Sequence, residues 1–217
     1  MDVLDEIDSI DVSSSTARNR LLEIVKNKDP EARLRAIEKI SLLPSDAEIL
    51  SALQEHLHDT DELVRLACIE AIEDYVDTSS IPKIKTCLDD EDWMVRGQAA
   101  IALSKLGDAD AYEIAKLKFA ECNDAEERSR YCFALFLVDK KHLKDIKDLY
   151  NSSSYRVRCA IANNLVDTIY FQWSTDAKLI SEVLQFLEDS RTIETQTSVL
   201  SSLEYAVSEI REIQNTA

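Results

Sequence analysis

The chain has 217 residues, of which 45% are apolar and only two are glycine and three proline. So few turn-forming residues argue against a β-sandwich or a glycine-rich nucleotide fold and favour long helices with short connections. The net charge of −17 repels phosphate backbones, so nucleic acid is not an expected partner. With no apolar run near the ~20 residues of a membrane span and no secretory leader pattern, we expect a cytoplasmic protein without membrane contact.

The first residues are acidic. The stretch MDVLDEIDSID carries five acids and no base. Its apolar side chains, Val3, Leu4, Ile7 and Ile10, fit one stripe of a helix. We therefore expect residues 1–16 to form an acidic tail or cap, either packed on the first repeat or loose, ahead of one domain over residues 17–217.

From residue 17 onward the chain repeats itself. Each unit has an apolar segment, a corner rich in Asp, Asn or Ser, and a second segment that begins near an arginine and continues with small and apolar residues. Counted from Arg33, the first of these arginines, to Arg158, the fifth, successive arginines are 32, 31, 32 and 30 residues apart. In a sixth copy Gln196 takes the place of the arginine. A fixed period of this size predicts a solenoid. We expect six helical hairpins, at residues 18–43, 46–77, 80–107, 109–138, 141–170 and 175–211.

The corner acids have a physical role in this arrangement. An Asp, Asn or Ser before a helix accepts hydrogen bonds from unpaired backbone N–H groups, which stabilises the helix by about 0.5–2 kcal/mol. The arginine lies near the end of the first turn and can reach a corner acid of its own or the neighbouring repeat. We therefore predict a structural ladder of ion pairs made by Arg33, Arg65, Arg96, Arg128 and Arg158.

Three features carry a resemblance to a known family. They are the pairs Val64-Arg65, Val95-Arg96 and Val157-Arg158, the corner residues Asp29, Asp59 and Asp89, and the tail Ala99–Asp108. Over roughly residues 18–211 the chain resembles the HEAT-repeat family, especially the short HEAT-like repeats of phycobilin lyases. The resemblance implies an all-α, right-handed α-solenoid whose second helices form a concave binding surface.

Acids and aromatic residues are the candidates for partner binding. Acidic side chains steer and attract a basic partner, and aromatic side chains often dominate binding energy. The alternatives are that the acids form a solvated helix face and that the aromatic insert near residues 168–176 fills a gap in the core. The candidates are Glu70, Glu73, Asp74, Asp77, Asp92, Trp93, Tyr170, Phe171 and Trp173.

No catalytic, cofactor or metal site is expected. His56 and His58 are two residues apart and point to different faces of a helix. The five cysteines form no CxxC pair and are typical of buried small side chains. Neither a phosphate-binding loop nor a hydrolase motif is present in the sequence.

These observations predict a non-catalytic, monomeric solenoid whose acidic concave face binds a basic protein. The HEAT-like immunity proteins of bacterial toxin systems are similar in kind, and the partner would then be a basic toxin domain such as a nuclease. A general scaffold or adaptor is an alternative. Bilin lyase-like or DNA glycosylase-like enzymes are others, although a glycosylase needs a basic groove that this chain does not provide.

Overall fold

The computed structural model describes residues 2–151 and 154–216 and contains thirteen α-helices and no strand over them. Contacts between residues divide the chain into two compact units, Met1–Asp108 and Ala109–Ala217, which are described separately below. None of the described helices is both long and apolar enough to cross a membrane. The all-α class that the sequence predicts is confirmed.

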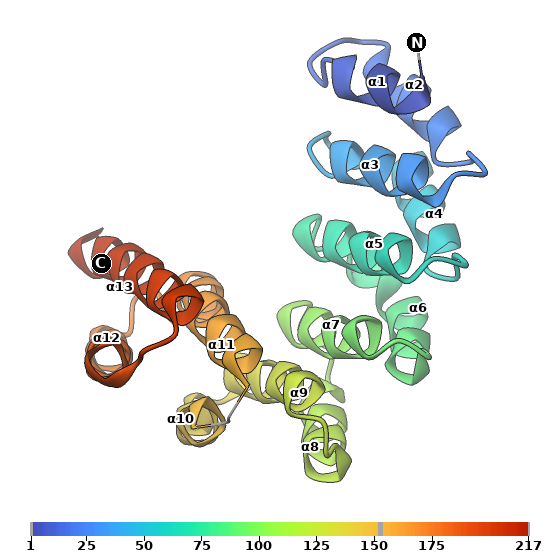
Figure 1. The fold of residues 1–217 in the computed structure, drawn as a ribbon. Helices are drawn as coiled ribbons and strands as arrows, with labels where there is room; N and C mark the ends of the chain where they lie inside the picture. Colours follow the sequence, from blue (N-terminus) through green and yellow to red (C-terminus); the bar gives the residue numbers. More distant parts are fainter. Residues whose placement is uncertain (1, 152–153, 217) are drawn as a thin grey trace. The chain divides into compact units, whose positions relative to one another are not determined.

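Unit 1 contains a short N-terminal helix and three helical hairpins. The second helices of the hairpins, α3, α5 and α7, pack on one another in order and form one layer (Figure 1). The first helices form the other layer, in which two 3₁₀ turns, η1 and η2, flank α6. The elements are α1 (Val3–Ser9), α2 (Ala17–Ile24), α3 (Pro30–Ile40), α4 (Ala47–His56), α5 (Glu62–Asp74), η1 (Thr78–Ser80), α6 (Ile81–Thr86), η2 (Cys87–Asp89) and α7 (Trp93–Lys105).

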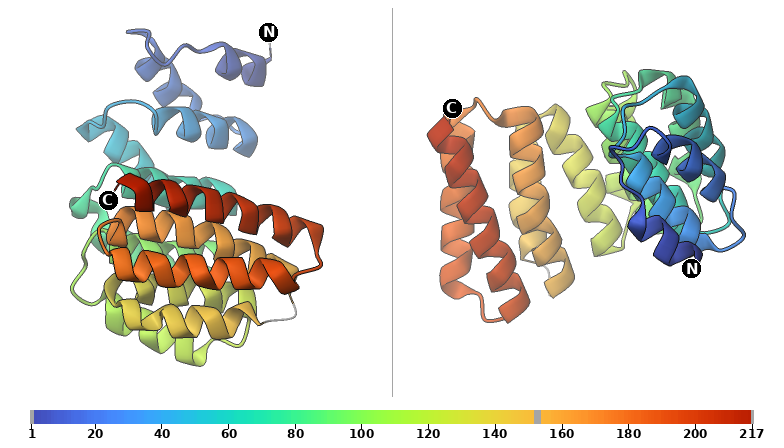
Figure 2. Two further views of the ribbon diagram at one scale, coloured as in Figure 1. Left: turned by 90° about the vertical axis from the view of Figure 1, so that its left-hand side faces the viewer. Right: turned by 90° about the horizontal axis from the view of Figure 1, so that it is seen from above.

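Unit 2 repeats this plan with three more hairpins, so the predicted number of six is confirmed. Its second helices, α9, α11 and α13, lie side by side (Figure 2). One turn of π-helix, η4, continues α11 and is the structural form of the insert predicted near residues 168–176. The elements are α8 (Ala111–Glu121), α9 (Ala125–Val138), η3 (Lys140–His142), α10 (Leu143–Tyr150), α11 (Tyr155–Thr168), η4 (Ile169–Trp173), α12 (Ala177–Ile193) and α13 (Thr197–Thr216).

Helix α1 covers one side of α3 in unit 1. Ile7 is completely buried there. Arg20 forms an ion pair with Glu6, which lowers the pKa of that carboxyl group, and Lys39 donates a hydrogen bond of 2.9 Å to the carbonyl oxygen of Ile10. The acidic start of the chain is therefore held against the first hairpin by one buried side chain and by polar contacts.

Aspartates begin most of the hairpin helices. Asp61 accepts hydrogen bonds from the backbone N–H groups of Leu63 and Val64, at 3.0 and 3.2 Å, and so satisfies two donors that have no partner within the helix. Hydrogen bonds from backbone N–H groups in the first turn of the following helix are accepted in the same way by the side chains of Asp29, Asp46, Asp92, Asp124 and Asp176.

Arg33, Arg65 and Arg158 reach forward to an acid of the next hairpin. Arg33 donates from Nε and Nη2 to the two carboxylate oxygens of Asp59, at 2.8 and 2.5 Å. Arg65 does the same to Asp90, at 2.8 and 2.6 Å. In unit 2 the N–H groups of Arg158 donate to Glu194 at 2.7 and 3.2 Å. Each acid lies two residues before the position that caps the following second helix.

Arg96 and Arg128 contact groups of their own hairpins. Arg96 donates to the carbonyl oxygens of Asp90 and Glu91 at its own corner. The guanidinium group of Arg128 lies 4.4 Å from the centre of the Phe119 ring. The corner that Arg128 would reach includes residues 152–153, which lie outside the described residues.

Two details of the repeat alignment are wrong. The corner acid that pairs with Arg65 is Asp90 and not Asp89, because Asp90 stands two residues before the capping Asp92, as Asp59 stands two residues before the capping Asp61. Gln196 is not the counterpart of the arginines. It immediately precedes α13 and accepts the N–H of Leu200, so it corresponds to the capping aspartates and Leu200 occupies the arginine position.

Helices α5 and α7 end in the same backbone motif. In both, the residue after the C-cap has a positive φ, 53° at Val76 and 72° at Gly107. The N–H of Val76 bonds to the carbonyl of Glu73 and that of Asp77 bonds to Ile72, as in a Schellman motif. Glycine adopts this conformation without strain, whereas a β-branched residue does not.

We expect Val76→Gly to raise the free energy of unfolding by about 1 kcal/mol, because the left-handed conformation costs a side chain of L-chirality about 1–2 kcal/mol and the valine side chain, 60% exposed, contributes little packing. Urea unfolding followed by circular dichroism measures the change. Gly107→Ala is the matched control and should lower stability, since an added Cβ meets no atom within 4 Å there and only φ is tested. A Val76→Gly chain less stable than the wild type contradicts this assignment of strain.

Candidate partner-binding groove

A groove of about 390 Å³ lies between α3 and α5 on the second-helix layer of unit 1. Its wall is apolar in part, and the side chain of Leu63 is 43% exposed. Its charged residues are all acids, and no lysine or arginine is among the ten residues that line it. These residues are Leu34, Ile37, Glu38, Ser41, Leu63, Leu66, Ala67, Glu70, Ala71 and Asp74.

The three acids of this groove are Glu38, Glu70 and Asp74, and all three side chains are exposed. Glu70 and Asp74 are one helical turn apart on α5, so they lie on the same face. Over residues 2–151 and 154–216 the carboxylates of Glu38 and Asp74 take part in no ion pair. These two carboxylates therefore present negative charge that the surrounding protein does not neutralise. The structure brings together two of the predicted site residues, Glu70 and Asp74, and adds Glu38.

Glu73 does not belong to this surface. The sequence predicts that it lies on an exposed acidic face, but only 9% of the residue is exposed. It forms an ion pair with Lys105 and accepts a hydrogen bond of 2.9 Å from Nε2 of Gln98, both from α7. Burial raises its pKa, against the opposing effect of Lys105. Glu73 thus connects two hairpins inside unit 1.

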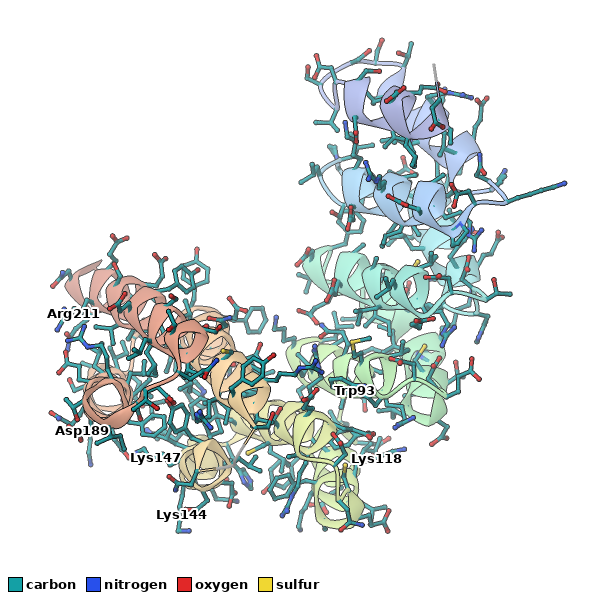
Figure 3. All side chains as sticks on the ribbon, in the orientation of Figure 1. Trp93, Lys118, Lys144, Lys147, Asp189 and Arg211 are labelled. Carbon is teal, nitrogen blue, oxygen red and sulfur yellow. The ribbon has the colours of Figure 1, made fainter. Side chains whose placement is uncertain are left out.

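Asp77 and Asp92 support local structure. Asp77 accepts bonds from the N–H and the hydroxyl group of Ser79, at 3.2 and 2.8 Å, and from the hydroxyl group of Ser80. Burial raises the pKa of Asp77, but these hydrogen bonds outweigh it, and the pKa lies below its usual value. Asp92 caps α7, and half-buried Trp93 is the first residue of that helix (Figure 3).

The aromatic insert of unit 2 is divided between core and surface. Nε1 of Trp173 donates a hydrogen bond of 3.2 Å to the carbonyl oxygen of Phe136 on α9, and the two aromatic rings are 6.4 Å apart. Tyr170 and Phe171 are 72% and 45% exposed. Trp173 therefore anchors the π-helical turn, while its two aromatic neighbours face solvent. They lie in unit 2, whereas the acidic groove lies in unit 1.

A second cavity, of about 530 Å³, lies in unit 2 between α10 and α12. Lys144 and Lys147, on α10, are among its residues (Figure 3). Five lysines and three acids line it, so its charge is mixed. Lys147 pairs with Glu182 at 2.7 Å, and Lys144 pairs with Asp148 at 2.6 Å. These lysines are neutralised from within the unit, in contrast to Glu38 and Asp74 of the groove.

Eight of the ten groove residues were not among the sequence-predicted candidates, and four of these eight are the leucines and the glutamate that make the groove apolar and acidic: Leu34, Glu38, Leu63 and Leu66. A signal for three of them was present. Counted from the ladder arginine, Leu34 and Leu66 occupy the next position in their repeats, and Glu38 and Glu70 occupy the fifth position after it. Aligning the repeats on the arginine would have shown a leucine and a glutamate recurring on two adjacent helices.

A sequence model of HEAT repeats matches residues 50–135, from α4 of unit 1 into α9 of unit 2. These residues are HEAT repeats. In the HEAT repeats of unit 1, the second helices α5 and α7 carry the Arg65 and Glu73 contacts described above. The groove extends this series on its N-terminal side, because α3 contributes the same leucine and glutamate positions as α5.

Several solved structures are similar to this chain. An engineered protein is 18% identical, with a TM-score of 0.45, over 89% of this chain and 96% of its own. The complex of CpcE and CpcF of phycocyanin lyase from Nostoc sp. PCC7120 is 18% identical, with a TM-score of 0.49, over 90% and 92%. A second engineered protein is 20% identical, with a TM-score of 0.46, over 95% and 60%. No curated protein matches the chain.

Proposed function

We propose that this chain is a non-catalytic HEAT-repeat scaffold that binds a basic protein through the acidic groove between α3 and α5. The observation that carries the proposal is the lining of the groove, which has three carboxylates and no cationic side chain beside exposed leucine. A protein that presents lysine or arginine next to an apolar side chain would complement both properties.

The distribution of charge supports the same proposal. Residues 1–108 hold 24 acids and 12 bases, a net charge of −12, whereas residues 109–217 hold 18 and 13, a net charge of −5. The unit that contains the groove is therefore the more negative one. Such a field raises the association rate of a basic partner and weakens as salt is added.

The more specific form of the proposal is an immunity protein that neutralises a toxin. The active sites of nucleases are basic because they hold phosphates, so an acidic groove can cover one and compete with its substrate. We place this binding in the cytoplasm, where the five free cysteines of the chain would stay reduced. A single monomeric chain would suffice for it. A general adaptor for a basic protein uses the same groove and differs only in the partner's activity.

Charge reversal in the groove tests the proposal. We expect Glu70→Lys/Asp74→Lys to retain about tenfold less basic partner than the wild type in a pull-down from the native host at low salt, because attraction becomes repulsion. Glu73 is left unchanged, since reversing it would break the buried contact with Lys105. Nuclease activity of the captured partner, measured with and without the chain, separates an immunity protein from an adaptor.

Asp5→Lys/Glu55→Lys is the matched control. It makes the same change of charge in the same unit, at two exposed acids outside the groove. We expect it to retain nearly as much partner as the wild type. Equal retention by the groove variant and the wild type would show that the groove is not the binding site, and equal losses in both variants would show that only net charge matters.

A further inference from the structure

We propose that the element of the partner that occupies the groove is an amphipathic helix with leucine-like side chains at one end and lysine or arginine at the other. This inference rests on the proposed function and specifies how the partner is recognised. It is based on where the apolar and acidic residues lie along the groove.

Apolar and acidic side chains are separated along the helix axes. Leu63 and Leu66 lie in the first half of α5, and Glu70 and Asp74 lie in its second half. From Leu66 to Asp74 the helix rises by about 12 Å, at 1.5 Å per residue. In α3 the leucine likewise precedes the glutamate by four residues. One end of the groove is therefore apolar, and the other is acidic on both of its walls.

The ends of the helices increase this difference between the apolar and the acidic end of the groove. The second helices occupy equivalent places in successive hairpins and run in the same direction (Figure 1). Their C-terminal ends thus lie at the acidic end of the groove, where the last carbonyl groups add partial negative charge. Cationic side chains of an occupant are favoured at this end by both the carboxylates and the helix dipoles.

A helix fits such a groove better than an extended segment. Side chains at positions i, i+3 or i+4, and i+7 of a helix form one ridge, which can pack between two adjacent helices. The described residues contain no strand, so they present no sheet edge to which an extended segment could add. A ridge with apolar residues in its first turns and basic residues about two turns later spans the ~12 Å between the two ends.

Two peptides of identical composition test the inference with the full chain. The first is a helical peptide with leucines at one end of a face and lysines at the other. The second has the same leucines and lysines interleaved along that face. Fluorescence anisotropy at low and roughly physiological salt, about 0.15 M, measures their affinities. We expect the separated peptide to bind about tenfold more tightly than the interleaved one at both salt concentrations.

Two variants assign the binding to the groove. Glu70→Lys/Asp74→Lys should abolish the preference for the separated peptide. Leu63→Ser, at an exposed position in the first turn of α5, should weaken the separated peptide severalfold and leave the interleaved one nearly unchanged. Circular dichroism checks that both variants are folded.

The outcomes separate this inference from the proposed function. Equal affinity for the two peptides, lost on charge reversal, would overturn the amphipathic helix and leave an acidic site for a basic protein. Failure of both peptides to bind at low salt would also overturn it. If the groove variant still retained the native partner as well as the wild type, the proposed function itself would fail.

Discussion

Replacing Arg33 by alanine is expected to lower the free energy of unfolding of the chain by roughly 3–5 kcal/mol, as for other buried ion pairs that lose one partner. The guanidinium group bonds to both carboxylate oxygens of Asp59 and donates to the carbonyl oxygens of Asn27 and Lys28, at 2.9 and 3.1 Å. The side chains of Arg33 and Asp59 are only 10% and 7% exposed. The variant leaves two carbonyl groups without this donor and a buried carboxylate without its cation, with the N–H of Asp61 still bonded to it at 3.0 Å.

The same helix contains a matched control for this prediction. Arg35 lies two residues later on α3, is 37% exposed, and pairs with Glu31 and Asp8 at the surface. Surface pairs contribute about 0–1 kcal/mol, so Arg35→Ala should have a small effect. Urea unfolding of both variants, followed by circular dichroism, measures the difference. Similar losses of stability in the two variants would show that the buried ion pair of Arg33 contributes no more to stability than a surface ion pair.

The second large effect is expected at the contact between α5 and α7. Lys105→Met removes the cation that faces Glu73, whose side chain is 8% exposed, and should lower stability by roughly 3 kcal/mol at pH 7. The hydrogen bond from Gln98 remains but cannot balance the charge. Thermal or urea unfolding of the variant and the wild type measures the loss.

This loss should depend on pH in a defined direction. Burial already raises the folded-state pKa of Glu73, and Lys105 opposes that effect, so the variant raises the pKa further. The folded variant then binds a proton more tightly than the unfolded chain. Its stability therefore falls as pH rises from the unfolded pKa of about 4.3 through the folded pKa. The deficit should be smaller at pH 5 than at pH 7.

A double variant supplies the control for the pH effect. Glu73→Gln/Lys105→Met carries no carboxylate at this contact, so its stability relative to Glu73→Gln should not change between pH 5 and pH 7. A deficit of Lys105→Met that is equal at the two pH values would mean that Glu73 is not the group that titrates.

The local chemistry of the fold was predictable from the sequence. Helix starts could be found because an aspartate before a helix has one dominant role there, as Asp61 and Asp92 show. The spacing of the arginines predicted the number of hairpins. The acid that pairs with Arg65 was readable as well, because Asp90 precedes Arg96 by six residues as Asp59 precedes Arg65, whereas Asp89 is one residue out of register.

The acidic site was predictable only in part, because sequence alone did not show which face of α5 the next hairpin covers. Glu70 and Asp74 are exposed, but Glu73 lies under α7. The position within the repeat did not decide this either, because the equivalent residue on α3, eight residues after Arg33, is Ser41, which lines the open groove.

The forward direction of the Arg33 and Arg65 contacts affects how repeats can be lost from such a chain during evolution. Arg33 and Arg65 each meet an acid that lies two residues before the next capping aspartate, so the spacing of residues is the same for both contacts. A deletion of residues 60–90 would join Asp59 to Glu91 and Asp92, and Arg33 would still meet Asp59 at the start of α7. Recombination that removes one such period thus keeps this ion pair at the new junction.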